Sequence, residues 1–241
     1  SFLLNVTSLG ALNSTGGYFA ALNEGSTSNY GASVWTRLNG ANYDIGINPR
    51  TTAANTVWSS SATSLNTTVF IVISYQLVSG IGNDIVKIWI NPTPGSSEPS
   101  ATLSATNTGG TDLANLNRVL LRQDGSTATP SVEMDEFRIG TSWASVTPGT
   151  PSSPSISGIE SGDKQLSVSF TAPSSNGGSA ITTYKYSTDG GSSWQTRATG
   201  TTGSPLVITT LSTDGTTALT NGVTYNVQIR AVNAAGDGAA T

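Results

Sequence analysis

The chain has 241 residues, and its net charge of −4 arises from 14 acidic and 10 basic residues that are scattered singly. It contains no histidine and no cysteine, which excludes a Ser–His–Asp triad, a thiol nucleophile, a disulfide bond and any metal site built on imidazole or thiolate. Without a basic stripe, nucleic acid is not expected as a partner. No apolar stretch is long enough for a membrane span, so direct membrane insertion is not expected either.

The hydrophobic residues, 36% of the chain, come in short runs that Gly, Ser, Thr and Asn separate. This pattern predicts an all-β protein with many turns. In the first part of the chain, the alternation of apolar and polar residues indicates eight strands, at residues 2–6, 18–22, 32–38, 43–47, 69–77, 84–90, 118–122 and 132–139.

A Pro-rich segment at residues 147–154 divides the chain. Three prolines among small polar residues favour an extended, semi-rigid linker. We therefore place a boundary near Thr150 and expect two domains, at residues 1–149 and 150–241.

In the second domain, strands are expected at residues 165–171, 181–186, 194–197 and 206–211, and one more begins at Tyr225. Apolar residues alternate from Tyr225 through Ile229, which predicts a strand with one buried face. A tyrosine at the head of such a strand, with Leu219 upstream, fits a tyrosine corner, in which the hydroxyl bonds back to the preceding backbone.

The segment from Ser187 to Trp194 matches the Asp-box pattern of sialidase propellers. A propeller requires this box in successive blades, and here it occurs once. We therefore interpret it as a hairpin device, in which Asp189 accepts backbone N–H bonds across the turn and Trp194 packs against the hairpin.

Together these features resemble a fibronectin type III domain, in a pattern that covers its penultimate strand. The resemblance rests on Leu219, Gly222, Tyr225, Val227, Ile229, Ala231, Asn233 and Gly236. It implies a β-sandwich that most often serves as an extracellular spacer or adhesion module, and it names no ligand by itself. Phe170 stands where the family usually has Trp, and the final strand is expected to be missing.

The first domain resembles the concanavalin A-like (laminin G-like) jelly rolls of bacterial secreted proteins. The resemblance rests mainly on Asp135-Glu136-Phe137-Arg138-Ile139, with support from the runs at residues 86–92 and 116–123. It implies a jelly-roll sandwich. The domain is short for a whole jelly roll, so its first strands are expected upstream of Ser1.

Acidic residues at 133, 135 and 136 invite comparison with jelly-roll glycosidases, which carry their carboxylates on one strand face. Glu133 and Asp135 can share a face, but Phe137 follows on it, and Glu136 is expected to point the other way, toward Arg138. The catalytic pattern is broken. We therefore expect no enzyme, and structural roles for Asp135, Glu136 and Arg138.

Aromatic residues concentrate in the first third of the chain, where they could stack on sugar rings. We expect Trp35 to share a polar, open face with Arg37, and we take Tyr30, Tyr43 and Trp58 as further ligand-binding candidates. The alternative is that these rings pack between layers or cover a sheet edge.

No cofactor is expected. Calcium is the ion that the residue types would suit, since it needs only oxygen ligands, although no EF-hand is present. The candidate ligands are Asn83, Asp84, Asp112, Asp124 and Asp135.

These observations favour a non-catalytic adhesion or glycan-binding module on a fibronectin-like spacer, part of a larger bacterial secreted or surface protein. Glycans or other surface proteins are the expected partners, with self-assembly through open strand edges. Two alternatives stay open: a structural repeat unit of a surface fibre or stalk, and an accessory region of a secreted polysaccharide hydrolase.

Overall fold

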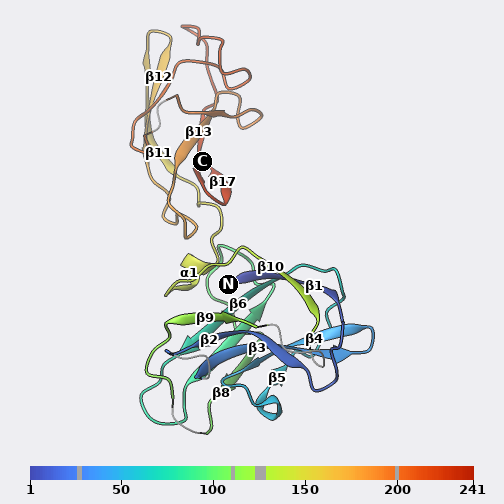
Figure 1. Cartoon of the computed structure of the whole chain (residues 1–241). Helices are drawn as coiled ribbons and strands as arrows, with labels where there is room; N and C mark the ends of the chain where they lie inside the picture. The colour runs from blue at the N-terminus through green and yellow to red at the C-terminus, as the bar shows by residue number, and fades with distance from the viewer. Residues whose placement is uncertain (26–28, 110–111, 123–128, 199–200) are drawn as a thin grey trace. The chain divides into compact units, whose positions relative to one another are not determined.

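The computed structural model describes residues 1–25, 29–109, 112–122, 129–198 and 201–241. The chain forms two compact units (Figure 1). The first comprises residues 1–92 and 98–139, and the second comprises residues 93–97 and 140–241. Residues 140–149, which the sequence assigns to the first domain, thus cluster with the second unit.

The first unit consists of two five-stranded antiparallel sheets. Sheet A has the order β10-β1-β6-β7-β8, with β10 (Ser131–Asp135), β1 (Phe2–Ser8), β6 (Val69–Gln76), β7 (Ile85–Ile90) and β8 (Leu103–Thr106). Sheet B has the order β5-β4-β3-β2-β9, with β5 (Val57–Trp58), β4 (Asn42–Asn48), β3 (Tyr30–Asn39), β2 (Gly17–Asn23) and β9 (Arg118–Leu121). A short 3-10 helix, η1 (Ala53–Asn55), precedes β5.

The strands of the first unit pair from the two ends of the sequence inward, the first with the last and the second with the one before the last. β1 pairs with β10 in sheet A, and β2 pairs with β9 in sheet B, a nesting typical of jelly rolls. The inward residues of both sheets form one apolar core, which includes Phe2, Leu4, Ile45, Ile71 and Ile88. The expected all-β sandwich is therefore confirmed, and β1 lies inside its sheet, paired with β10 and β6.

The second unit is also a sandwich of two antiparallel sheets. One has the order β11-β12-β15, with β11 (Ser155–Gly162), β12 (Gln165–Thr171) and β15 (Leu206–Ile208). The other has the order β14-β13-β16-β17, with β14 (Gln195–Thr196), β13 (Thr183–Ser187), β16 (Gln228–Asn233) and β17 (Gly236–Ala240). A one-turn helix, α1 (Trp143–Val146), precedes them. Leu219, Val168 and Ile229 are buried in the core.

The final strand that the sequence was expected to lack is present. β17 pairs with β16, which also pairs with β13, so β16 presents no open edge for another chain. The sequence Gly-Asp-Gly-Ala-Ala of β17 has no apolar alternation. The strand is held instead by backbone pairing with β16 and by the ion pairs of Asp237 with Lys185 and Arg230.

The segment that precedes β16 forms the expected corner. The hydroxyl of Tyr225 accepts a hydrogen bond from the backbone N–H of Thr220 at 2.9 Å. The strand itself begins three residues later than predicted, at Gln228. In the described part of the chain, no helix is long and apolar enough to cross a membrane.

Candidate ligand-binding face of the first unit

The outer face of sheet B carries aromatic and arginine side chains. Along β3, Ala32 and Val34 belong to the core, and the alternation of a strand turns Trp35 and Arg37 outward. Tyr18 of β2 lies opposite Trp35 in the strand register. The alternation of residues along the strands therefore brings the candidate binding residues Trp35 and Arg37 together on the outer face of sheet B.

Four rings form a continuous series on this face, which we call the aromatic row: Tyr30, Tyr18, Trp35 and Trp58. The ring centroids of Tyr30 and Tyr18 are 5.4 Å apart, those of Tyr18 and Trp35 are 5.5 Å apart, and those of Trp35 and Trp58 are 6.4 Å apart in an edge-to-face contact. These separations suit favourable aromatic pairs. The row thus connects side chains of three strands, β2, β3 and β5.

Two guanidinium groups lie over rings of the row. The Arg122 guanidinium carbon is 4.4 Å from the Tyr18 centroid, and that of Arg37 is 4.6 Å from the Trp58 centroid. Both distances fall within the range of cation–π attraction. The outer face of sheet B therefore carries two cationic groups, those of Arg37 and Arg122, in contact with its aromatic rings.

Trp35 is not on an open face, contrary to expectation. It is only 4% exposed, and its indole N–H donates to Ser33 Oγ at 2.8 Å. The unpredicted strand β5 explains this, since it pairs with β4 and places Trp58 opposite Gly46. A Cβ at Gly46 would lie 2.7 Å from Cε3 of Trp58, so the glycine makes room for the ring. Trp58 and Tyr30 are the rings that remain partly exposed.

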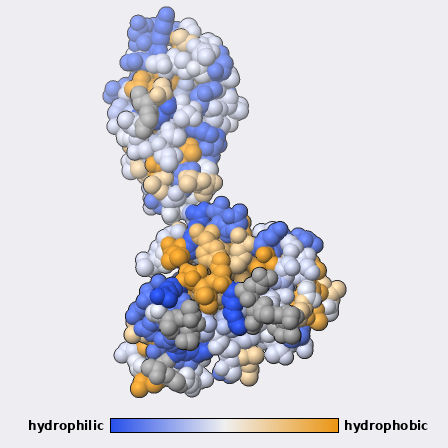
Figure 2. All heavy atoms as spheres, in the orientation of Figure 1, coloured by the Kyte–Doolittle hydropathy of each residue, from blue (hydrophilic) through white to orange (hydrophobic). Residues whose placement is uncertain are grey.

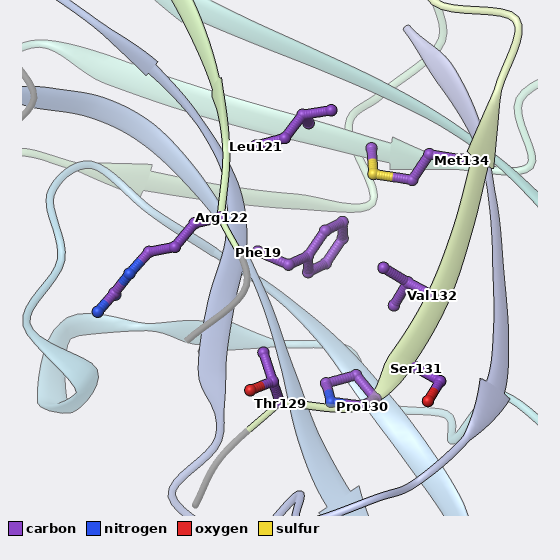
Figure 3. A pocket seen from close by; sticks show the side chains of 8 residues that line it. All are labelled: Phe19, Leu121, Arg122, Thr129, Pro130, Ser131, Val132 and Met134. Atoms are coloured by element: carbon purple, nitrogen blue, oxygen red, sulfur yellow. The ribbon is translucent and has the colours of Figure 1, made fainter. Parts of the chain in front are cut away.

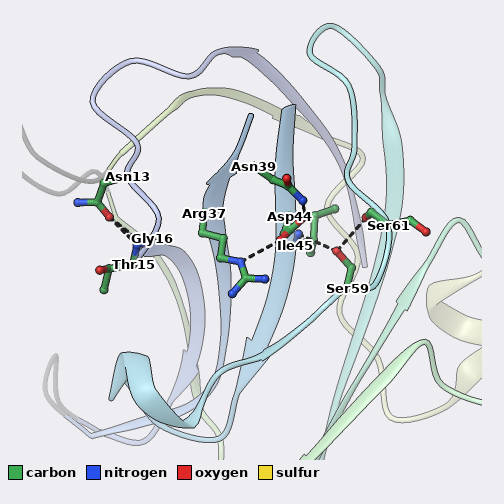
Figure 4. A network of polar contacts seen from close by, with 9 residues as sticks. All are labelled: Asn13, Thr15, Gly16, Arg37, Asn39, Asp44, Ile45, Ser59 and Ser61. Carbon is green, nitrogen blue, oxygen red and sulfur yellow. Dashed lines mark hydrogen bonds and ion pairs between the residues drawn. The ribbon is translucent and has the colours of Figure 1, made fainter. Parts of the chain in front are cut away.

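A buried carboxylate holds Arg37 in place (Figure 4). Asp44 of β4 is 2% exposed, and its two oxygens accept from Arg37 Nε at 2.8 Å and from Asn39 Nδ2 at 2.7 Å. Charge-assisted bonds of this kind are short and strong. The Nε side of the Arg37 guanidinium group is therefore held in one position by Asp44.

Two further sets of hydrogen bonds hold the loops around Arg37 (Figure 4). Ser59 Oγ accepts the backbone N–H of Ile45 at 3.2 Å and donates to the carbonyl of Ser61 at 3.1 Å. Asn13 Oδ1 accepts the backbone N–H groups of Thr15 and Gly16, each at 2.9 Å. The segments that border Arg37 are therefore held by specific bonds.

Arg50 secures the other end of the aromatic row. Its Nη1 donates to the carbonyl of Tyr30 at 2.9 Å and to Asn29 Oδ1 at 3.3 Å, and its backbone N–H donates to Asn48 at 2.7 Å. The sequence reasoning missed Arg50, Asp44 and Arg122. The alternation of β4, in which Asp44 and Asn48 face away from the core, was the signal that could have found Asp44.

Tyr43 does not belong to the binding face. It is fully buried in the core, because the register of β4 turns it inward with Ile45 and Ile47. Burial raises the pKa of Tyr43 to about 12. This residue cannot contact a ligand, and its expected binding role was wrong.

The acidic run lies on the other sheet. Glu133 and Asp135 are exposed on β10, where Glu133 Oε2 accepts from Asn5 Nδ2 at 3.0 Å. The strand ends at Asp135 rather than Ile139, since Glu136 has a φ of 53° and Asp135 accepts its N–H at 2.7 Å. Glu136 forms an ion pair with Arg138 at 2.8 Å, the arrangement that the sequence suggested.

The calcium candidates are bonded to hydrogen-bond donors. Asp84 is 1% exposed and accepts from the Tyr75 hydroxyl and the Val78 N–H, while Asp112 accepts from Asn107 Nδ2 and the Asn83 N–H. Desolvation works in the opposite direction, but these hydrogen bonds lower the pKa of Asp112. Asp135 lies elsewhere, and Asp124 falls outside the described residues. Within those residues, no three acidic groups gather as a metal site would require.

No protein-family model matches the chain, and no curated protein matches it. Among solved structures, a crystal structure of domains from titin matches with 11% sequence identity, covering 100% of this chain and 99% of that chain. Its TM-score is 0.25, a value from which nothing follows about the fold or function of this chain.

Proposed function

We propose that the first unit is a non-catalytic carbohydrate-binding module whose ligand lies along the aromatic row. The observation that carries this proposal is the combination of partly exposed rings, Trp58 and Tyr30, with the guanidinium of Arg37 held beside Trp58. Sugar rings present apolar C–H faces, which suit aromatic rings, and hydroxyl groups, which suit arginine and amide donors.

Prior ordering of the site supports the proposal. Trp35 and Tyr18 are almost fully buried beneath their neighbours, and Asp44 fixes the Nε of Arg37. A face that is already rigid loses little conformational entropy when a ligand binds. An open, shallow surface can therefore hold a sugar without a deep pocket.

A binding role fits this face better than catalysis. Glycoside hydrolysis needs two carboxyl groups flanking the scissile bond. Asp44 accepts with both oxygens from Arg37 and Asn39, while Glu133 and Asp135 belong to sheet A. The row is thus not accompanied by a free pair of carboxylates within the described residues.

The second unit is proposed to act as a fibronectin type III-like spacer. Two observations support this role: the unit is a sandwich of a three-stranded and a four-stranded sheet, and Tyr225 forms a tyrosine corner. The whole is proposed to belong to an extracellular bacterial protein, in which the spacer presents the binding module to glycans of a surface or matrix.

A glycan array tests the proposal with a matched pair of variants. Trp58→Ala removes a ring of the row, and Trp194→Ala removes a ring of the second unit that is also partly exposed and lies under a guanidinium, that of Arg230 at 4.1 Å. We expect the wild-type signals to fall at least tenfold in Trp58→Ala and to persist in Trp194→Ala. Circular dichroism of both variants checks that they fold.

Two array results would contradict the proposal. One is a wild-type chain that binds no glycan on the array. The other is an equal loss of signal in the two variants, which would remove the row from the binding site.

A further inference from the structure

The core of the first unit opens at one edge, between β9 of sheet B and β10 of sheet A. A cavity of about 400 Å³ lies there. Figure 3 shows Phe19 and Leu121 pointing toward Val132 and Met134 from opposite sides of the gap, while Arg122 points away. We call this feature the edge groove.

The side chains of the edge groove are core residues by register. Leu121 lies opposite Ala20, and Met134 lies opposite Leu4, both of which are buried. Leu121 is nevertheless 55% exposed. Among the residues that the structure describes, none forms over the inward face of β9 the covering layer that buries its neighbours.

A series of ring contacts leads from Phe19, which lines the groove, through the buried ring of Phe2 to the exposed Phe137. Phe19 contacts Phe2 edge to face at 6.4 Å, and Phe2 stacks on Phe137 at 5.2 Å. Phe137 is 41% exposed. Figure 2 shows a hydrophobic patch on the first unit, and a contiguous patch of this kind commonly marks an interaction site.

Unpaired backbone borders the groove on both sides. Among the described strands, β10 pairs with β1 alone and β9 pairs with β2 alone. The N–H and C=O groups on the far side of an edge strand are a template for another strand. A strand added to β10 would place alternate side chains in the groove.

The remaining side chains of such a strand would face acidic residues. The outward residues of β10 are Ser131, Glu133 and Asp135, all exposed, and residues directly opposite each other on paired strands have Cβ atoms about 4.5–5.5 Å apart. Lysine or arginine at the outward positions of the added strand would therefore be attracted, and acidic residues repelled. The edge thus selects a strand by charge as well as by shape.

We propose that the free edge of β10 captures an extended segment of a partner protein in which apolar and basic residues alternate. The apolar residues fill the edge groove against Leu121 and Met134, the basic residues lie beside Glu133 and Asp135, and backbone bonds extend sheet A. This is strand addition, in which main-chain bonds give affinity and alternate side chains give specificity. The site is distinct from the aromatic row and does not depend on it.

Two labelled nine-residue peptides test the proposal, one alternating Val with Lys and one alternating Val with Glu. Fluorescence anisotropy with the full chain is expected to show at least tenfold tighter binding of the Val–Lys peptide. The double variant Glu133→Lys/Asp135→Lys should prefer the Val–Glu peptide. Leu121→Asp should weaken binding of the Val–Lys peptide at least tenfold, and Ile81→Asp, at a position 85% exposed outside the groove, should leave it unchanged.

Hydrogen exchange supplies a readout that does not depend on the variants. Bound Val–Lys peptide should slow the exchange of amides in residues 131–135. No binding at millimolar peptide, equal binding of the two peptides, or a preference that survives the charge reversal would overturn the proposal. So would a wild-type dimer that Leu121→Asp disperses, because a second copy would then occupy the groove.

Discussion

Asp189 organises the hairpin between β13 and β14. It accepts hydrogen bonds from the hydroxyl of Ser193 at 2.6 Å, from the hydroxyl of Ser187 at 2.7 Å and from the backbone N–H of Ser193 at 2.9 Å. These bonds lower the pKa of Asp189 to about 2. Trp194 closes the turn by donating to the carbonyl of Gly191 at 3.0 Å, as the hairpin interpretation of this segment requires.

This lowered pKa predicts a loss of stability in acid. An aspartate in the unfolded chain has a pKa near 3.9, so between about pH 4 and pH 2 the unfolded chain binds a proton that the folded chain does not. Stability due to Asp189 is present above about pH 4 and is lost as the pH falls through about 2. Melting temperatures measured from pH 5 to pH 2 should fall less steeply in Asp189→Asn than in the wild type, and equal slopes would contradict this account.

Tyr225 contributes through one hydrogen bond. Tyr225→Phe leaves the N–H of Thr220 without its acceptor, and we expect the free energy of unfolding to fall by about 0.5–1.5 kcal/mol. Chemical denaturation of the full chain measures this change. Val223→Ala is the control, because Val223 is 51% exposed and its truncation should change stability by less than about 0.5 kcal/mol. Equal effects of the two substitutions would contradict the claim that the hydrogen bond of Tyr225 stabilises the second unit.

At the scale of elements, the Pro-rich segment is bonded to the second unit. Asn233 Nδ2 donates to the carbonyls of Gly149 and Asn176, both at 2.8 Å, and the N–H of Gly149 donates to the carbonyl of Gly177 at 2.7 Å. A Cβ at Gly177 would lie 2.1 Å from the Gly149 oxygen, so only glycine permits this approach. The segment that the sequence suggests as a linker is therefore held in place at Gly149.

Removing these bonds should release the segment. Asn233→Ala removes both of its bonds to the Gly149 and Asn176 carbonyls. At about 0.5–1.5 kcal/mol for each bond, we expect the free energy of unfolding to fall by about 1–3 kcal/mol, together with faster proteolysis at residues 147–150. Asn226→Ala, at an exposed position, is the matched control. Wild-type chain that is cleaved at residues 147–150 as fast as Asn233→Ala would show that these bonds do not protect the segment.

The sequence predicts strands well where a buried face imposes alternation. β3, β4, β6 and β7 were located in this way because each contributes core residues. β5, β8, β11 and β17 were not located. Each is short or weakly apolar and is held mainly by backbone pairing with a neighbour, and such pairing leaves little trace in local composition.

The largest error about the candidate site was the expected exposure of Trp35, and it arose because strand β5 was not predicted. Once Trp58 lies opposite Gly46, it shields Trp35, so the exposed ring is Trp58. The inward position of Tyr43 follows from the register of β4, which places its odd-numbered residues in the core. Both outcomes depend on which strands are neighbours, and a single sequence does not give that.

At the scale of the whole molecule, each unit buries its own apolar core, and contacts between distant parts of the chain complete the fold. The bond between Asn5 and Glu133 joins residues 128 positions apart. The all-β class was predictable because composition and periodicity are local properties. The nested order of the strands was not, since it depends on these long-range pairings.

The central claim is that a glycan lies along the aromatic row of sheet B. The five tryptophans of the chain report on this directly, because each indole N–H gives its own signal in an NMR spectrum. Trp35 and Trp58 belong to the row, Trp89 lies on β7 of sheet A, and Trp143 and Trp194 belong to the second unit.

The decisive measurement is a titration of the ¹⁵N-labelled chain with an oligosaccharide selected on the array. The account predicts that the Trp58 indole signal shifts most, that of Trp35 shifts with it, and those of Trp89, Trp143 and Trp194 stay in place. Shifts confined to Trp89 or to the tryptophans of the second unit, with the Trp58 signal unmoved, would contradict it.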